Sequence, residues 1–324
     1  MKKYNWAILG PGNIAREMGK ALTEVNGEIY AVGARDIKSA EKFAEEFNVK
    51  KVYGNCDEML KDPEIDIVYI STPHTFHYEY LMKALSYGKH VFCEKAITVN
   101  GKQLDEAVSL AKEKNLVIAE GMTIYHMPLY KKLKEIVNSG AIGKVKMVQV
   151  NFGSCKEFDP SNRFFSKELA GGALLDIGVY AVSFARFFLE SKPNTILTTV
   201  KYFDTGVDEQ SGIILKNDSE QMAVIALTLT AKQPKRGVVA GTEGYIEISN
   251  YPRADKAFIT YTQDGRTEEI NLGDTSKALN YEVEDMQNYI SLRNDKEQLA
   301  FSSDVSHILS EVRNQWGFKY PFEK

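Results

Sequence analysis

An acidic and a phenolic side chain stand four residues apart in the segment 171–180, behind a pair of glycines. Asp176 and Tyr180 would share one face of a helix, because residues at positions i and i+4 lie above one another. Gly171 and Gly172 would allow the backbone to approach a planar ligand closely. These residue types suit a site that handles protons, and they suit equally a buried helix that carries one satisfied polar pair.

A second candidate group is the pair Glu94 and Lys95, directly after the apolar run 90–93. If this run is a parallel strand, both side chains lie at its carboxyl end, where ligands of open α/β sheets bind. Lys95 could bond a substrate hydroxyl there, and a cation beside Tyr180 would lower the pKa of its phenol from about 10. The alternative is an ordinary surface ion pair, which contributes little to stability.

The turn that starts at Gly10 has the pattern Gly-x-Gly-x-x-Ala and follows the first apolar run of the chain. Gly10 permits the tight turn, and Gly12 removes a side chain where a pyrophosphate would lie. Asn13 and Ile14 begin the following helix, whose first N–H groups would bind the anion. Because the pattern stands at the first of several strand-to-helix junctions, it predicts a dinucleotide site rather than a glycine turn that binds nothing.

The end of the second predicted strand bears on the identity of the dinucleotide. Sites for NAD usually place Asp or Glu there against the ribose hydroxyls, whereas this chain has Arg35 followed by Asp36. Arg35 could bind a 2′-phosphate as a fork, and the Ser39 hydroxyl could add a contact. The sequence therefore favours NADP. NAD remains the alternative, with Arg35 stacked on the adenine and Asp36 on the ribose.

The loop after the predicted strand 67–70 reaches the same edge of the sheet. It supplies five candidate cofactor contacts, which are Ser71, Thr72, Pro73, His74 and His77. Two histidines without a third ligand or a nearby carboxylate make a poor metal site, so we expect no metal. We expect them to line the cofactor cleft, or else to cap the next helix.

Short apolar runs alternate with amphipathic stretches as far as residue 120, which is the pattern of a parallel sheet flanked by helices. The predicted strands are 6–9, 29–34, 67–70, 90–93 and 117–119. The predicted helices are 14–23, 37–47, 57–60, 76–87 and 101–114. This part of the chain should therefore form a doubly wound α/β domain, with the candidate cofactor residues at its carboxyl edge.

Beyond residue 121 one helix, 129–139, is followed by strands with few helices among them. The predicted strands are 144–152, 195–202, 211–215, 222–230, 235–241, 245–248, 258–262 and 268–272, and further helices are 171–189, 282–293 and 303–316. This order predicts a second, α+β domain with a mostly antiparallel sheet, and hence two domains, 1–121 and 122–324. Arg163 and Phe164 precede the helix 171–189 and are weak candidates for a substrate pocket.

Composition limits the classes of partner. The 324 residues carry a net charge of −4, which gives no electrostatic reason to expect a nucleic acid, so we expect a small-molecule substrate. Cys56, Cys93 and Cys155 show neither a disulfide framework nor zinc spacing, which favours a reducing compartment. The chain has no apolar signal core and no apolar run of membrane-spanning length. We therefore expect a cytoplasmic protein that does not insert into membranes.

The order and spacing of these motifs resemble the Gfo/Idh/MocA oxidoreductases. The resemblance rests on the glycine turn at 10–15, the segment 71–74, Glu94-Lys95 and the segment 171–180, and it covers nearly the whole chain. It implies an N-terminal Rossmann domain and a C-terminal domain whose open sheet packs against a partner subunit, giving a homodimer or homotetramer. It also implies that Lys95 contacts nicotinamide and substrate. Ala96 departs from the family by replacing the usual proline.

With a tyrosine at position 180, the sequence resembles the branch of dimeric dihydrodiol dehydrogenase and glucose-fructose oxidoreductase. The inositol dehydrogenase branch has a histidine in that helix. The resemblance implies an NADP(H)-dependent enzyme that moves a hydride between nicotinamide and a carbinol carbon of a sugar, polyol or cyclic diol. Tyr180 would be the acid/base, with Lys95 as its electrostatic partner. Asp176 would orient the substrate or hold Lys95. The alternatives are a dinucleotide-binding sensor or regulatory protein without turnover, and a purely structural protein.

Overall fold

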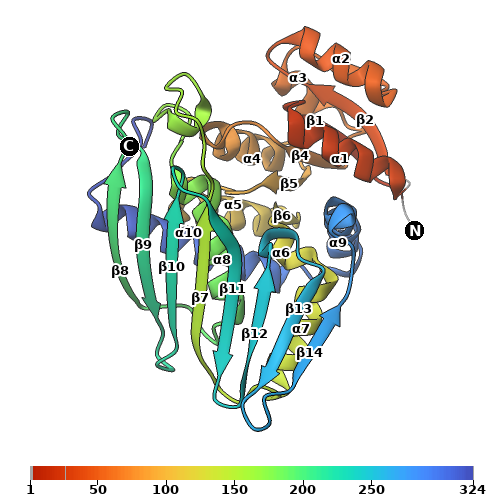
Figure 1. Ribbon diagram of the computed structural model, residues 1–324. Coiled ribbons are helices and arrows are strands. Elements are labelled where there is room, and N and C mark those ends of the chain that lie inside the picture. Colours follow the sequence, from red (N-terminus) through yellow and green to blue (C-terminus); the bar gives the residue numbers. More distant parts are fainter. Residues whose placement is uncertain (1–2, 26, 324) are drawn as a thin grey trace. The chain divides into compact units, whose positions relative to one another are not determined.

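The computed structural model describes residues 3–25 and 27–323, so the outermost residues of both predicted domains, 1–2 and 324, lie outside the description. The chain divides into two compact units (Figure 1). The first comprises Met1–Thr98, Lys102–Met122 and Ser276–Ala300. The second comprises Val99–Gly101, Thr123–Thr275 and Phe301–Lys324.

The first unit is built on a six-stranded parallel sheet in the order β3-β2-β1-β4-β5-β6. The strands are β1 (Asn5–Leu9), β2 (Glu28–Gly33), β3 (Lys51–Tyr53), β4 (Ile67–Ile70), β5 (His90–Glu94) and β6 (Ile118–Gly121). The connecting helices are α1 (Asn13–Glu24), α2 (Ile37–Phe47), α3 (Cys56–Lys61), α4 (His77–Ser86) and α5 (Gly101–Glu113). The strand order reverses between β1 and β4, and doubly wound sheets bind their ligands at such a switch point.

Burial explains which of these strands the sequence could predict. Every residue of β4 is buried, because a parallel sheet is covered on both faces and its central strands are therefore continuous apolar runs. The structure confirms the predicted α/β fold. The prediction missed β3, an edge strand of three residues whose Lys51 and Val52 are exposed.

The helix α9 (Ala278–Leu292) groups with the first unit, whereas the two-domain prediction placed all residues beyond 121 in the second. Side chains fix it there. Lys277 Nζ and Asn280 Nδ2 both donate to Glu24 of α1, at 2.6 and 2.9 Å, and the hydroxyls of Tyr4 and Ser291 lie 3.3 Å apart. The apolar face of a helix does not reveal in the sequence which sheet it covers.

The second unit contains an eight-stranded sheet in the order β14-β13-β12-β11-β7-β10-β9-β8. Its strands are β7 (Val145–Gly153), β8 (Thr195–Tyr202), β9 (Asp208–Lys216), β10 (Met222–Thr228), β11 (Gln233–Gly241), β12 (Gly244–Ser249), β13 (Lys256–Tyr261) and β14 (Thr267–Asn271). Neighbouring strands are antiparallel except β7 and β10, which pair in parallel. The predicted mostly antiparallel sheet is confirmed. The helices around it include α6 (Thr123–His126), α7 (Pro128–Asn138), α8 (Val179–Phe188) and most of α10 (Lys296–Gln315).

One face of this sheet is covered and the other is open. In β10 the side chains of Ala223, Ile225 and Leu227 are buried, while that of Val224 between them is exposed. The helix α8 packs against β7 and β10 on the covered face (Figure 1). The sheet therefore supplies a rigid base for the helix that carries Tyr180.

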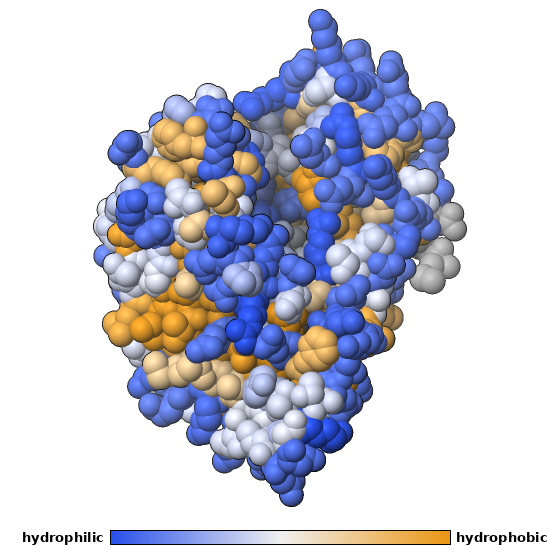
Figure 2. Space-filling model, viewed as in Figure 1, coloured by the Kyte–Doolittle hydropathy of each residue, from blue (hydrophilic) through white to orange (hydrophobic). Residues whose placement is uncertain are grey.

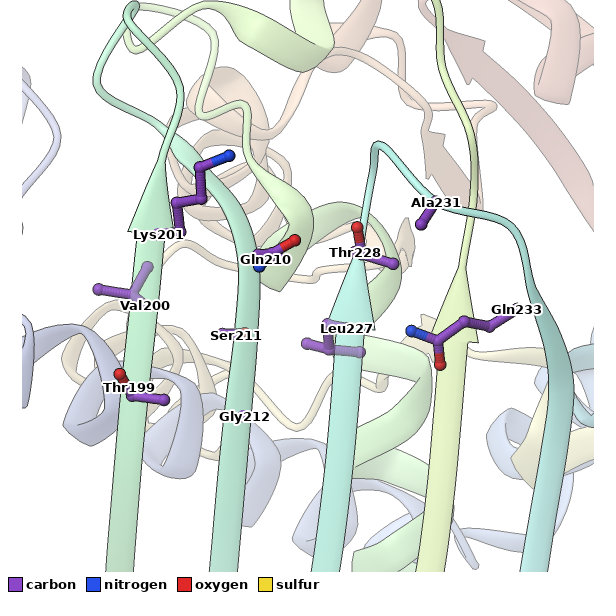
Figure 3. Close-up of a pocket in the computed structure, with 10 residues that line it drawn as sticks. All are labelled: Thr199, Val200, Lys201, Gln210, Ser211, Gly212, Leu227, Thr228, Ala231 and Gln233. Atoms are coloured by element: carbon purple, nitrogen blue, oxygen red, sulfur yellow. The ribbon is translucent and has the colours of Figure 1, made fainter.

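The open face presents apolar side chains to solvent. Figure 2 shows them gathered over β8, β9 and β10. The exposed large apolar residues on this face are Leu197, Ile214, Val224, Tyr245 and Phe258. A pocket of about 420 Å³ lies across β8–β11 (Figure 3), lined by residues that include Thr199, Lys201, Gln210 and Thr228. None of the helices in the described part of the chain combines the length and the apolar character needed to cross a membrane.

Candidate functional site

The turn from β1 into α1 leaves open space where the sequence predicted a pyrophosphate. Gly10 has φ +93, and a Cβ on it would lie 3.0 Å from Thr72 Cγ2, so glycine is required there. A Cβ on Gly12 would meet no atom within 4 Å. Gly12 is also the N-cap residue of α1, whose first N–H groups receive no side-chain cap. This end of the helix is therefore suited to bind an anion.

A pocket of about 400 Å³ lies at this turn within the first unit. Seven predicted cofactor residues line it, namely Gly10, Gly12, Arg35, Ser39, Ser71, Thr72 and Pro73. Seven further residues line the pocket. Asp36 was predicted only in the alternative with NAD. The other six were not predicted as contacts, namely Leu9, Pro11, Ala34, Cys56, Phe76 and Tyr80. Asn13 and Ile14 start α1 and stand outside this lining.

Arg35 lies exposed at the pocket, where its guanidinium stacks 4.6 Å from the centre of the Phe76 ring. This cation–π contact holds the side chain near the pocket while its N–H groups can still reach a ligand. Asp36 is engaged locally, because its carboxylate accepts from Lys38 N at 3.2 Å and caps α2. Ser39 Oγ donates to the Asp36 carbonyl at 2.9 Å. The arrangement fits a cofactor that carries a phosphate near Arg35.

His74 and His77 connect loops through their rings, and neither is among the residues that line this pocket, so their predicted contact with a cofactor stays a prediction. His77 is fully buried; its Nε2 lies 2.8 Å from the Thr72 carbonyl and its Nδ1 2.9 Å from the Ala96 carbonyl. His74 Nε2 lies 3.1 Å from the Lys95 carbonyl. Among the described residues no group of three His, Cys, Asp or Glu side chains could hold a metal ion. The histidines thus fix the loop after β5 to the loop after β4.

Glu94 is buried, and its predicted contact with a cofactor stays a prediction. Its Oε1 accepts from the buried Tyr69 hydroxyl at 2.5 Å. Burial, followed by the charge of Glu94, raises the pKa of Tyr69 well above its ordinary value, so this phenol stays a donor. Lys95 is half-buried at the end of β5, and the peptide bond between Lys95 and Ala96 is cis.

The segment 171–180 begins with a π-helical turn, Leu174–Gly178, which continues directly into α8. The prediction of one regular α-helix from residue 171 is therefore wrong at its start. A π-helical turn contains more residues than an α-helical turn, so the i, i+4 rule of an α-helix does not apply directly to Asp176 and Tyr180. Such turns occur frequently at functional sites.

The glycine pair serves close contacts with the chain itself, not with a planar ligand. A Cβ on Gly171 would lie 2.6 Å from the Arg163 carbonyl oxygen. Gly172 has φ +112, and a Cβ on it would lie 2.0 Å from Asp208 Oδ1. The sequence correctly predicted a close approach at these two glycines. It predicted a planar ligand as the neighbour, whereas the structure places the Arg163 carbonyl and Asp208 there.

Asp208 is a functional candidate that the sequence reasoning missed. Its Oδ2 accepts from Leu174 N at 2.6 Å, so it caps the start of the π-helical turn. Burial raises the pKa of Asp208 to about 6, although backbone N–H donors and the charge of Arg313 act in the opposite direction. Asp208 is distant from Leu174 in the sequence, and only the folded chain brings them together.

Asp176 lies in a small charged cluster with both predicted substrate residues. Lys156 Nζ and Arg163 Nη2 each lie 3.7 Å from a different oxygen of its carboxylate. The Phe164 ring is contacted by both cations, with Lys156 Nζ 3.6 Å and Arg163 Cζ 4.2 Å from the ring centre. Lys156 was not predicted. The cluster combines hydrogen-bond donors, an acceptor and an aromatic face, which suits a hydroxylated ligand.

Tyr180 stands at the edge of an aromatic group under α8. It is half-buried, and its ring centre lies 6.2 Å from that of Phe152. The Tyr251 ring also packs against Phe152, with ring centres 6.1 Å apart, and burial, followed by the neighbouring Tyr180, raises the pKa of the Tyr251 phenol well above its ordinary value. Asp176 and Tyr180 belong to the second unit and Lys95 to the first.

The glycine turn, the pocket beside it and the reversal of strand order define the first unit as a dinucleotide-binding domain. Comparison with known families gives the same class. Residues 4–122 match a family model described as "Oxidoreductase family, NAD-binding Rossmann fold", and residues 130–247 match the C-terminal domain of the same family. The chain belongs to the Gfo/Idh/MocA family of oxidoreductases.

Similar proteins cover the chain from end to end. Trans-1,2-dihydrobenzene-1,2-diol dehydrogenase of Xenopus tropicalis is 31% identical, with 98% of this chain and 99% of that protein aligned. The human protein of the same name is 28% identical, with 98% of each aligned. Levoglucosan dehydrogenase, solved with NADH and levoglucosan, superposes with a TM-score of 0.88 at 18% identity, covering 99% of this chain and 100% of that one. A 3-ketoreductase from Actinomadura kijaniata, solved with NADP and TDP-benzene, superposes with a TM-score of 0.86 at 22% identity, covering 97% and 98%. These two likenesses concern the fold.

Proposed function

We propose that this oxidoreductase uses NADP(H) to interconvert a carbinol and a carbonyl group on a sugar, polyol or cyclic diol. The pocket at the Gly10 turn carries the proposal, because it combines open space at Gly12 with the exposed guanidinium of Arg35. Arg35, Ser39 and the N-terminus of α1 would bind the phosphates. NAD remains the alternative cofactor, and the family's NAD-binding description is compatible with both.

When bound, the nicotinamide would supply the hydride for reduction and accept it in oxidation. In the direction of reduction, Tyr180 donates its phenolic proton to the carbonyl oxygen of the substrate. In oxidation the phenolate takes that proton back from the hydroxyl. Lys95 is assigned to stabilise the phenolate and to bond the same oxygen. Proton transfer by a positioned group typically contributes about 10²–10⁴-fold to the rate.

Asp176 is assigned to orient the substrate. Its carboxylate can accept from substrate hydroxyls, while Lys156 and Arg163 beside it can donate to other oxygens. The Phe164 ring offers an apolar face for the carbon skeleton. This combination supports a substrate with adjacent oxygens, such as the diol named for the Xenopus relative or the sugar derivative named for levoglucosan dehydrogenase.

A panel of sugars, polyols and cyclic diols, assayed with NADP and with NAD by the absorbance of the reduced nicotinamide, tests this function. We expect turnover with at least one member of the panel and a preference for NADP. Binding of the dinucleotide without oxidation of any alcohol or reduction of any corresponding ketone would instead support a sensor or regulatory protein.

We also propose a homodimer or homotetramer that forms through the open face of the eight-stranded sheet. Its exposed apolar side chains on β8, β9 and β10 support a second copy as the partner. All three cysteines are free thiols, with Cys56 and Cys93 buried and Cys155 exposed. A reducing compartment suits free thiols, so the cytoplasm is the proposed location.

A further inference from the structure

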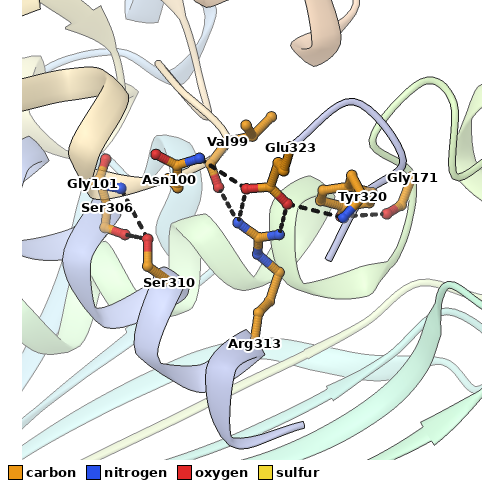
Figure 4. Close-up of polar contacts among 9 residues, drawn as sticks. All are labelled: Val99, Asn100, Gly101, Gly171, Ser306, Ser310, Arg313, Tyr320 and Glu323. Carbon is orange, nitrogen blue, oxygen red and sulfur yellow. Dashed lines mark hydrogen bonds and ion pairs between the residues drawn. The ribbon is translucent and has the colours of Figure 1, made fainter. Parts of the chain in front are cut away.

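The C-terminal tail of the chain contacts the segment that carries Asp176 and Tyr180, inside the second unit (Figure 4). We call residues 171–180 the proton-donor segment. The Tyr320 hydroxyl donates to the carbonyl of Gly171, the first residue of that segment, at 2.8 Å. Tyr320 is 1% exposed, and burial raises the pKa of its phenol well above the ordinary value. The hydroxyl therefore stays protonated and remains a donor.

A buried ion pair holds the tail in place. Arg313 on α10 donates to both carboxylate oxygens of Glu323, at 2.5 and 2.9 Å, and to the Val99 carbonyl at 2.6 Å. Glu323 in turn accepts from the Tyr320 backbone N–H at 2.9 Å. The Arg313 guanidinium also lies 4.9 Å from the centre of the Tyr320 ring. Both charges are buried and paired, so this ion pair fixes the position of the C-terminal tail, residues 320–323.

Other contacts hold the start of the proton-donor segment from different directions. Asp208 holds the N–H of Leu174, two residues before Asp176, and the Phe164 carbonyl accepts from Gly172 N at 2.9 Å. Tyr320 holds the preceding residue, because its hydroxyl donates to the Gly171 carbonyl (Figure 4). The start of the π-helical turn is therefore held by the loop just before it, by Asp208 and by Tyr320 near the end of the chain.

We propose that Tyr320 is a positioning residue for the reaction, which sets the orientation of Tyr180 by holding the Gly171 carbonyl. The inference rests on the proposed function, in which Tyr180 moves the proton. A displacement of the reacting group by about 1 Å can cost roughly a hundredfold in rate, so even a small shift of this segment should be measurable.

The variant Tyr320→Phe tests the inference, because it keeps the ring contacts with Phe318 and Phe322 and removes only the hydroxyl. We expect kcat to fall about tenfold. The KM for the dinucleotide should not change, since its pocket lies in the other unit. Amide hydrogen exchange at residues 172–178 should become faster. If Tyr320 has only a structural role, Tyr320→Phe will lower the melting temperature. The kcat measured well below that temperature will then stay unchanged.

Tyr202→Phe is the matched control. Tyr202 also stacks on Phe318, with ring centres 6.0 Å apart, and its hydroxyl donates to the Trp316 carbonyl at 3.4 Å, not to Gly171. We expect this variant to keep the kcat and the exchange rates of the unmodified enzyme. An equal fall of kcat in both variants, or no change of kcat in Tyr320→Phe, would overturn the inference.

Two further variants keep the outcome interpretable. If Tyr320→Phe does not fold, Glu323→Asp keeps the charge beside the buried Arg313 and shortens the reach of the carboxylate that holds the Tyr320 backbone N–H. An unchanged kcat in that variant would overturn the inference. Turnover that survives unchanged in Tyr180→Phe would remove the proposed role of Tyr180, whereas an unmodified protein without turnover would remove the proposed function itself. Loss of turnover in Tyr180→Phe together with a normal kcat in Tyr320→Phe would remove only the positioning role.

Discussion

At the scale of single residues, Arg35 is the side chain that we expect to distinguish NADP from NAD. We expect Arg35→Ala to weaken NADP binding by about tenfold to a hundredfold, because a charge-assisted bond to the 2′-phosphate is lost, while NAD binding changes little. Fluorescence titration with both dinucleotides measures the two affinities. Lys38→Ala is the control, since this neighbouring cation on α2 does not line the pocket. An equal loss of affinity for NADP and NAD would contradict the assignment of Arg35.

The two glycines of the turn should respond differently to alanine. Gly12→Ala adds a methyl group where no atom lies within 4 Å, so the protein should keep its melting temperature and lose affinity for the dinucleotide. Gly10→Ala places a side chain at φ +93 against Thr72 and should destabilise the fold. Thermal unfolding and cofactor titration separate the two effects. Unchanged cofactor affinity in Gly12→Ala would mean that no pyrophosphate lies there.

Residue types predicted from local patterns proved more reliable than the geometry assigned to them. Gly10 and Arg35 follow local strand-to-helix patterns, and both line the pocket. His77 is a polar residue in the same kind of loop, but both its ring nitrogens lie at hydrogen-bonding distance from backbone carbonyls. No sequence pattern distinguishes such a histidine from one that contacts a ligand. Asp208 was missed because its partner Leu174 is distant in sequence.

The cap on the π-helical turn gives a prediction at the scale of elements. The pKa of Asp208 is about 6 in the folded protein, above its ordinary value of 3.8, so the folded state binds this proton more tightly than the unfolded state. Stability from this group is therefore present at low pH and is lost as pH rises from about 4 to 6. Relative to Asp208→Asn, the unmodified protein should lose about 3 kcal/mol across that range.

Urea unfolding of both proteins at several pH values measures this difference. A difference in the free energy of unfolding that stays constant from acid to neutral pH would show that folding does not raise the pKa of Asp208. Among the elements themselves, the long apolar strands were predictable because burial on both faces leaves a continuous pattern. The short strand β3 and the π-helical turn were not, since one has no buried run and the other depends on tertiary contacts.

The open sheet face gives the prediction that belongs to the whole molecule. We expect Val224→Asp, in the middle of β10, to convert the proposed homodimer to monomers, because it places a charge in an apolar contact. Leu292→Asp is the matched control, as this exposed leucine is the last residue of α9 and belongs to the first unit. Sedimentation equilibrium measures the mass. A monomeric parent protein, or a dimer that survives Val224→Asp, would rule out this face as the interface.

The two-unit organisation was predictable from the change of pattern near residue 121, and the assignment of the later helices was not. The helix α9 returns to the first unit through contacts of Glu24 and Tyr4, which no local pattern reveals. The division matters for function, because Lys95 and the pocket belong to one unit and Tyr180 to the other. Cofactor binding and proton transfer should therefore be separable by mutation.

The turnover and cofactor affinity of Tyr180→Phe test the central claim most directly. The substitution keeps the ring against Phe152 and removes only the phenolic proton. We predict that kcat falls at least about a hundredfold while the Kd for NADP stays unchanged. Turnover equal to that of the unmodified enzyme would contradict the account, because Tyr180 would then have no part in moving the proton.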